Sequence, residues 1–89
     1  MFFRFEQNNA GGFFVEGLPE TLFVEAPSPD EANAIAEANG VDFEDGCSGC
    51  CGDRWVRVYD AQHGMNAVAF AEAIALAIEY NSTYRVVTE

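Results

Sequence analysis

The chain has 89 residues, 49% of them hydrophobic and 13% aromatic, which excludes a disordered polypeptide and leaves room for one domain. Its formal net charge is −11, because fifteen acids stand against four arginines and no lysine. This balance argues against binding to a nucleic-acid backbone, which requires a basic surface. It is compatible with a solvated acidic surface, with a cationic partner protein, or with mimicry of a polyanion.

No segment approaches the roughly 18 apolar residues that a membrane-spanning helix requires. The first residues also lack the basic and then apolar pattern of a signal peptide. The number of cysteines is three, and an odd count argues against a secreted disulfide framework. We therefore expect a cytosolic protein in which the thiols stay reduced.

The amino-terminal third has the pattern of short strands. Residues 2–7 alternate as a strand does. Three of these side chains share one face: Phe3, Phe5 and Gln7. The Asn- and Gly-rich residues 8–12 predict a turn, and residues 13–16 predict a second strand that completes a hairpin. Residues 21–26 predict a further extended segment.

A short helix is predicted after this segment. Ser28 can cap its amino terminus, Pro29 suits the first turn, and Glu31 stands at the position that a capping box requires. Gly40 supplies a left-handed residue that ends the helix. The apolar stripe is thin enough to lie close on a sheet, and it consists of Ala32, Ile35, Ala36 and Asn39.

The sequence pattern of residues 65–80 fits the period of a strand and also that of a helix. Alanine at every odd position from 67 to 77 mimics a strand, yet alanine is also the strongest helix former. We predict a helix with two apolar ridges, in which Glu72 and Glu79 are the charged residues. Such a helix is expected to bury both sides, the second against a partner subunit. The alternative is that Leu76 and Tyr80 lie half exposed.

Two further strands complete the prediction. Residues 55–59 alternate as a strand that places Trp55, Arg57 and Tyr59 on one face, and residues 84–87 form the last strand. The order is then ββαβαβ. The predicted fold class is α+β, a single domain over residues 1–89 with a small antiparallel or mixed sheet and two helices on one face.

The cysteines suggest a metal site. Cys47 and Cys50 have the spacing of a zinc knuckle, and Cys51 or His63 could complete a tetrahedral site. The sequence has no second Cys-x-x-Cys pair. The alternative is that the cysteines are reduced and partly buried, acting as small hydrophobic residues. We expect no cofactor, and zinc is the alternative that the cysteines leave open.

A small-ligand site suits the same region better. Trp55 and Tyr59 could stack a base, while Arg57 between them could meet a phosphate. The backbone amides of Gly49 and Gly52 could cradle an anion. The alternative is an aromatic pair that packs against the apolar helix. Further candidates for contacts to phosphate or ribose are Asn8, Asn9, Asp53 and Arg54.

Two segments resemble a family of small uncharacterised proteins from tailed bacteriophages, which typically carry Gln-Asn-Asn-x-Gly-Gly and Cys-x-Cys-Cys-Gly-Asp-Arg-Trp. The matching segments are Gln7-Asn8-Asn9-Ala10-Gly11-Gly12 and Cys50-Cys51-Gly52-Asp53-Arg54-Trp55. The likeness covers about residues 1–59. This chain has Cys47 in place of a cysteine two positions before Cys50, and its alanine-rich tail is not a feature that we associate with the family.

The resemblance implies a phage accessory protein in the cytoplasm of an infected bacterium, where small acidic proteins often inhibit antiviral defence. Some of them sequester nucleotide immune signals such as cyclic ADP-ribose derivatives between subunits, and others mimic DNA or block a defence enzyme. Our first hypothesis is a homo-oligomeric, non-enzymatic protein that sequesters such a signal. The second is an acidic inhibitor or DNA mimic that binds a host protein, and the third is a small zinc-binding module.

Overall fold

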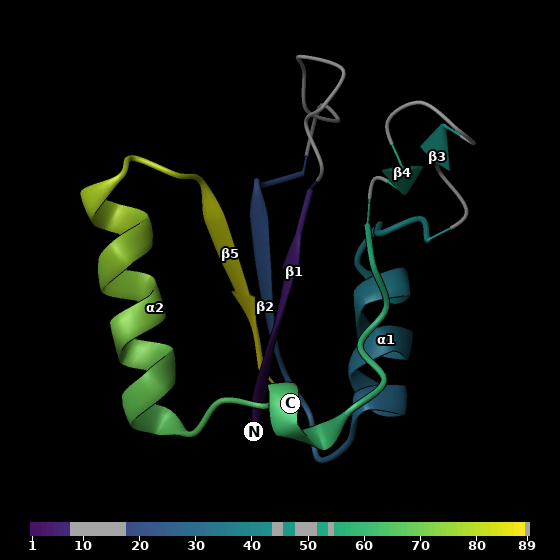
Figure 1. Cartoon of the computed structure of the whole chain (residues 1–89), viewed down its shortest axis with the longest axis horizontal. Helices are drawn as coiled ribbons and strands as arrows, with labels where there is room; N and C mark the ends of the chain where they lie inside the picture. The colour runs from purple at the N-terminus through teal and green to yellow at the C-terminus, as the bar shows by residue number, and fades with distance from the viewer. Residues whose placement is uncertain (8–17, 44–45, 48–51, 54, 89) are drawn as a thin grey trace.

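A computed structural model describes residues 1–7, 18–43, 46–47, 52–53 and 55–88 (Figure 1). The turn expected at residues 8–12 and the strand expected at 13–16 lie outside the described residues. None of the helices in the described ranges has the length and apolar character needed to cross a membrane.

The fold is α+β, as the sequence predicts, and its centre is a mixed sheet of three strands. The strand order is β1 (Phe2–Glu6), β2 (Thr21–Glu25) and β5 (Tyr84–Val87). β1 runs antiparallel to β2, and β5 runs parallel to it. Phe5 lies opposite Leu22, and Phe23 lies opposite Val86. Two further strands, β3 (Gly46–Cys47) and β4 (Gly52–Asp53), pair with each other in a separate antiparallel ribbon.

The helix α1 (Pro29–Ala38) forms where the capping signals predict it. The Ser28 hydroxyl accepts a hydrogen bond from the Glu31 backbone N–H at 3.3 Å, and Pro29 occupies the first turn. Gly40 follows with a φ of 102°, a left-handed conformation that favours glycine. The thin alanine face of α1 then lies directly on the sheet.

The core lies between α1 and one face of β1 and β2. Because side chains alternate along a strand, Phe3 and Phe5 share this face with Leu22 and Val24. All four are at most 1% exposed. The remaining buried members of this cluster are Ala26, Ala32, Ala36, Val41, Phe43, Trp55 and Val58.

The second helix is α2 (Ala67–Glu79), so the alanine-rich segment is helical, as predicted, and does not form a strand. The Asn66 side chain caps it by accepting a hydrogen bond from the Ala69 N–H at 2.8 Å. Phe70 stacks on Phe2 with ring centroids 3.8 Å apart and meets Phe23 edge-on at 5.4 Å.

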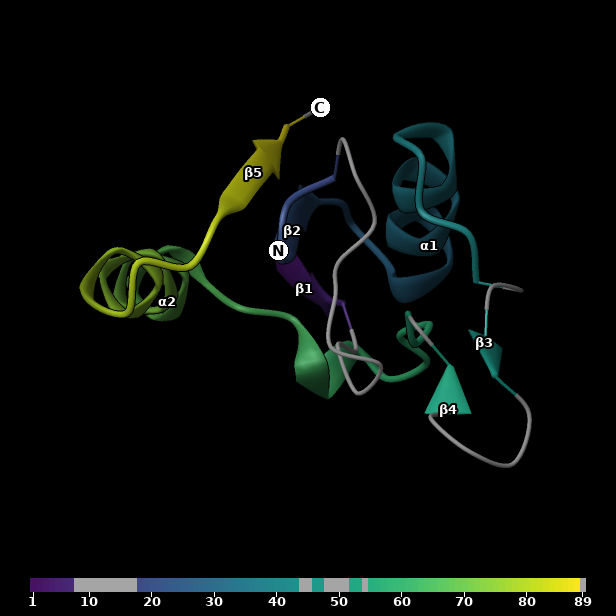
Figure 2. The same cartoon turned by 90° about the horizontal axis from the view of Figure 1, so that it is seen from above.

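Two parts of the predicted topology are wrong. Phe2 and Phe23 project to the side of the sheet opposite the α1 core, so the two helices lie on opposite faces, as Figure 2 shows from above. The segment 55–59 is not a strand: it runs along α1 and pairs with no strand of the sheet. The order of the main elements is therefore ββααβ, with the short ribbon and the turn η1 (Ala61–His63) between the helices.

Candidate functional site

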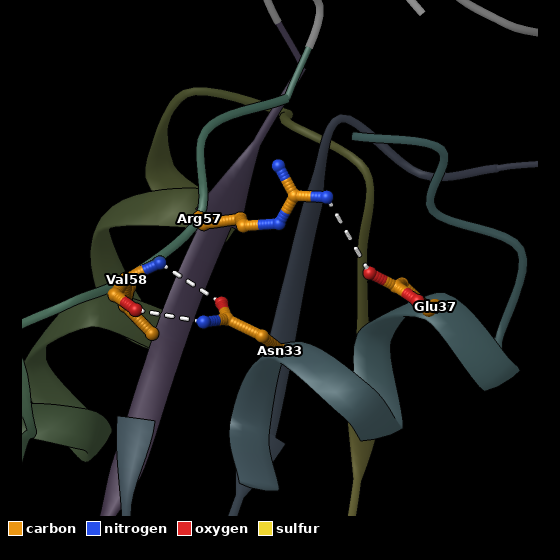
Figure 3. A network of polar contacts seen from close by, with 4 residues as sticks. All are labelled: Asn33, Glu37, Arg57 and Val58. Atoms are coloured by element: carbon orange, nitrogen blue, oxygen red, sulfur yellow. Dashed lines mark hydrogen bonds and ion pairs between the residues drawn. The ribbon is translucent and has the colours of Figure 1, made fainter. Parts of the chain in front are cut away.

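The segment that follows the ribbon is held against α1 by one buried asparagine. Asn33 is 9% exposed, and its amide accepts a hydrogen bond from the Val58 N–H at 2.9 Å. The same amide donates to the Val58 carbonyl at 2.7 Å (Figure 3). Because both backbone groups of Val58 are paired in this way, a side chain takes the place that a neighbouring strand would fill.

This clamp positions Arg57 over α1. Its guanidinium lies 3.8 Å from the Glu37 carboxylate and 4.8 Å from the centre of the Phe43 ring. The side chain remains 35% exposed, and that of Glu37 is 54% exposed. Figure 3 shows Arg57 reaching from the segment toward the carboxyl end of α1. The ion pair and the cation–π contact together fix the direction of the guanidinium.

A surface hollow of about 390 Å³ lies at this point. Its lining consists of Glu37, Val41, Asp42, Phe43 and Arg57. Two carboxylates and one guanidinium give the hollow a net negative charge. It therefore favours a cationic group over a phosphate, even though it contains an arginine.

A second hollow lies between α2 and the opposite face of the sheet, with a volume of about 230 Å³. Arg4 and Glu6 form part of its lining, together with Leu76 and Tyr80 of α2. The Arg4 Nε lies 3.2 Å from a Glu6 carboxylate oxygen, so this guanidinium too is paired with an acid. The hollow therefore offers an anion less attraction than the presence of an arginine alone suggests.

The structure separates the aromatic residues that were expected to stack a base. Trp55 is 1% exposed and belongs to the core, whereas Tyr59 is 78% exposed. The alternation of a strand, on which their common face depended, is absent from this segment. Trp55 therefore has a packing role in the described structure, and Tyr59 and Arg57 are the accessible members of the proposed ligand site.

Other predicted site residues fall where the structure gives little or nothing. Asn8, Asn9 and Arg54 lie outside the described residues, as do Cys50 and Cys51. For Cys47, Gly52 and Asp53 the structure describes the backbone. In the ribbon, Gly52 lies opposite Cys47, and Asp53 follows Gly52 along β4. Their predicted roles remain predictions.

The proposed histidine ligand lies far from the ribbon. His63 ends η1, the green turn at the bottom of Figure 1, whereas β3 and β4 lie at the top of the molecule. The structure therefore does not bring His63 to Cys47. In the ranges that are described, no group of three or more histidine, cysteine, aspartate or glutamate side chains could hold a metal ion.

Apart from Arg57, the residues that build the hollow were not predicted from the sequence. Glu37 and Phe43 were not singled out, and Asn33 was not recognised as the clamp. One signal was available for Asn33, because it lies three residues before Ala36 on the buried side of α1. A buried amide needs hydrogen-bond partners, so this position predicts a contact to a backbone outside the helix.

The chain belongs to a family described as "Domain of unknown function (DUF7296)", which it matches over residues 1–87. The match extends beyond residue 59, so the alanine-rich helix and the last strand are part of the family's domain. No curated protein and no solved structure matches the chain.

Proposed function

We propose that this protein is a non-enzymatic inhibitor that binds a basic surface on another protein, acting as a phage accessory protein against host defence. The phage context comes from the resemblance of the two short sequence segments. The binding mode is inferred from the hollow at Arg57, which is lined by two carboxylates, Glu37 and Asp42, and by one guanidinium. An arginine or lysine of a partner meets two carboxylates and the edge of an aromatic ring there.

The surroundings of this hollow favour the same partner. Asp30, Glu31 and Glu37 are exposed along α1, and Asp60 is exposed where the clamped segment ends. The chain as a whole carries a net charge of −11. Long-range attraction of a basic protein is therefore expected to speed association, and to weaken as salt screens it.

Titration calorimetry with an arginine-rich peptide tests this proposal. The double variant Glu37→Gln, Asp42→Asn is expected to bind several-fold more weakly, since exposed ion pairs contribute about 0.2–1 kcal/mol each. The matched control is Glu72→Gln, Glu79→Gln, which removes the same charge from α2. Equal weakening by both double variants would show that net charge, and not the hollow, governs binding.

Sequestration of a nucleotide-derived signal is the second candidate. It is favoured by the exposed Tyr59, two residues from Arg57 and its hollow of about 390 Å³. The two candidates respond in opposite ways to one substitution. Glu37→Gln releases Arg57 from its ion pair and adds neutral donors, so it strengthens binding of an anionic nucleotide and weakens binding of a basic peptide.

A second experiment distinguishes the two candidates, using protein purified from infected or expressing bacteria. Native mass spectrometry followed by denaturation detects any nucleotide that the protein carries. Release of an intact nucleotide, together with its loss in Arg57→Ala, would support sequestration over the protein-binding proposal. Release of a cleaved product would instead indicate an enzyme.

A further inference from the structure

The strand β5 leaves one edge of the sheet open. It is the last strand in the order β1-β2-β5, and no described element lies beyond it in Figure 2. The opposite edge is covered at its amino-terminal end, where Phe2 exchanges two backbone hydrogen bonds with Met65, at 2.9 and 2.7 Å. Among the described residues β5 carries no such bridge on its outer side, so it is the more open edge for adding a further strand.

The direction of the free backbone groups follows from one hydrogen bond. The Thr83 carbonyl accepts from the Thr21 N–H, so the backbone groups of Thr83 point toward β2. The two backbone groups of a residue point to the same side, and this side alternates along a strand. Those of Arg85 and Val87 therefore face β2, whereas the N–H and C=O groups of Tyr84 and Val86 face the open edge.

An apolar flank of α2 lies on the same side. Leu76 and Tyr80 line the hollow against β1, and Ile78 lies about 160° from Leu76 around the helix, on the flank away from β1. Ile78 is 60% exposed, Tyr84 38% and Val86 37%. We define the open face as the outer edge of β5 together with Ile78, Tyr84 and Val86. Patches of this kind on small domains commonly mark interaction sites.

The open face is the part of the chain with the fewest acids. Residues 61–89 contain three acids, Glu72, Glu79 and Glu89, and one cation, Arg85. Residues 1–60 contain twelve acids and three arginines. Two copies of a chain with a net charge of −11 repel each other over most orientations. The repulsion is least where these carboxyl-terminal segments face each other.

We propose that the open face binds a second copy of this chain, with β5 pairing antiparallel to the partner's β5 across a twofold axis. A strand edge is self-complementary under such an axis, so donors and acceptors of one copy meet those of the other. The pairing joins the two sheets into one of six strands. This inference does not depend on the proposed function, because Glu37 of α1 lines the hollow at Arg57, and α1 lies across the sheet from α2 (Figure 1).

Electrostatics favours one register over the other. With Arg85 opposite the partner's Arg85, two guanidinium groups would stand directly across from each other, which is destabilising. With Val86 opposite the partner's Val86, each Arg85 stands opposite the partner's Val87. This register also pairs Tyr84 with the partner's Thr88, so the outward groups of three residues per copy are satisfied.

The area is at the low end of what a stable pair needs. The three apolar side chains of the open face are only partly exposed, Ile78 by 60%, Tyr84 by 38% and Val86 by 37%. A stable, specific pair buries about 1,000 Å² or more in total, so three such side chains and one strand edge per copy predict a weak dimer. We therefore expect a dimer that forms in the micromolar range and dissociates on dilution.

Sedimentation velocity on the full chain, from about 1 to 200 µM, tests this proposal. The unmodified chain is expected to shift from monomer to dimer over this range. Val86→Pro removes an N–H that faces the open edge and leaves the bonds to β2 intact, so it is expected to weaken the dimer at least tenfold. Val86→Thr keeps the N–H at a similar size and is expected to dimerise as the unmodified chain does.

A second pair of variants leaves β5 unchanged, which keeps the test decisive if Val86→Pro fails to fold. Ile78→Glu places a charge in the open face and is expected to weaken the dimer, whereas Leu76→Glu places it in the hollow against β1 and is not. A monomer at every concentration of the unmodified chain would overturn the proposal. So would a dimer that survives Ile78→Glu and Val86→Pro, or one that Leu76→Glu weakens equally.

Discussion

The two helices cover the two faces of one sheet in different ways. α1 lies on a face whose phenylalanines, leucine and valine are almost completely buried, and Asn33 ties a later segment to it. α2 contacts the other face through Phe70, and none of its residues is buried. The difference indicates that the chain packs one half of its core more completely than the other, and the second half is where we propose that a second copy binds.

The largest expected contrast comes from truncating one phenylalanine on each face. Phe3→Ala empties a fully buried position and is expected to lower the free energy of unfolding by about 3–5 kcal/mol. Phe70→Ala removes a partly exposed ring and two aromatic contacts, for about 2 kcal/mol. Urea unfolding followed by circular dichroism measures both. Equal losses would mean that the α2 face is as well packed as the α1 face.

The next contrast isolates the asparagine clamp. Asn33→Ala leaves the N–H and C=O of buried Val58 without partners, and is expected to lower the free energy of unfolding by about 2–3 kcal/mol. Its matched control is Asn39→Ala, which removes one partly buried bond to the Ile35 carbonyl and costs about 1 kcal/mol. If Asn33→Ala cost no more than this control, the clamp would not hold the segment as we describe.

The smallest contrast compares the two helix caps. Ser28→Ala and Asn66→Ala each remove a side-chain acceptor from the first turn of a helix, which typically costs about 1 kcal/mol. For α1 the loss is expected in global stability, because the helix is part of the core. For α2 it is expected as faster local opening of residues 66–70, measured by hydrogen exchange. Global destabilisation by both caps to the same extent would contradict this distinction.

The sequence predicted the elements whose signals are local. Ser28, Pro29 and Gly40 determine where α1 begins and ends, and the helix propensity of alanine decided the conformation of α2. The fold class follows from these elements and the alternation in residues 2–7. The strand expected at 55–59 did not form, because the backbone of Val58 pairs with Asn33, a side chain on a helix distant in sequence.

The candidate site was predicted less well for the same reason. Trp55 was given a ligand-binding role because a strand would place it on one face with Tyr59, yet its burial depends on strands and a helix elsewhere in the chain. Arg57 was predicted to meet a phosphate, and the structure leaves its side chain 35% exposed. Its pairing with Glu37 could not be predicted, because it depends on the Asn33 clamp, and it reverses the charge preference of the site.

Hydrogen exchange of the unmodified chain at two concentrations tests whether α1 completes its half of the domain while the α2 side binds a second copy. The amides of α1 are expected to exchange slowly at both concentrations. Those of Tyr84 and Val86 are expected to exchange fast in dilute solution and to gain protection on concentration, with Arg85 and Val87 changing less. Unchanged exchange of Tyr84 and Val86 across the concentrations would contradict the account.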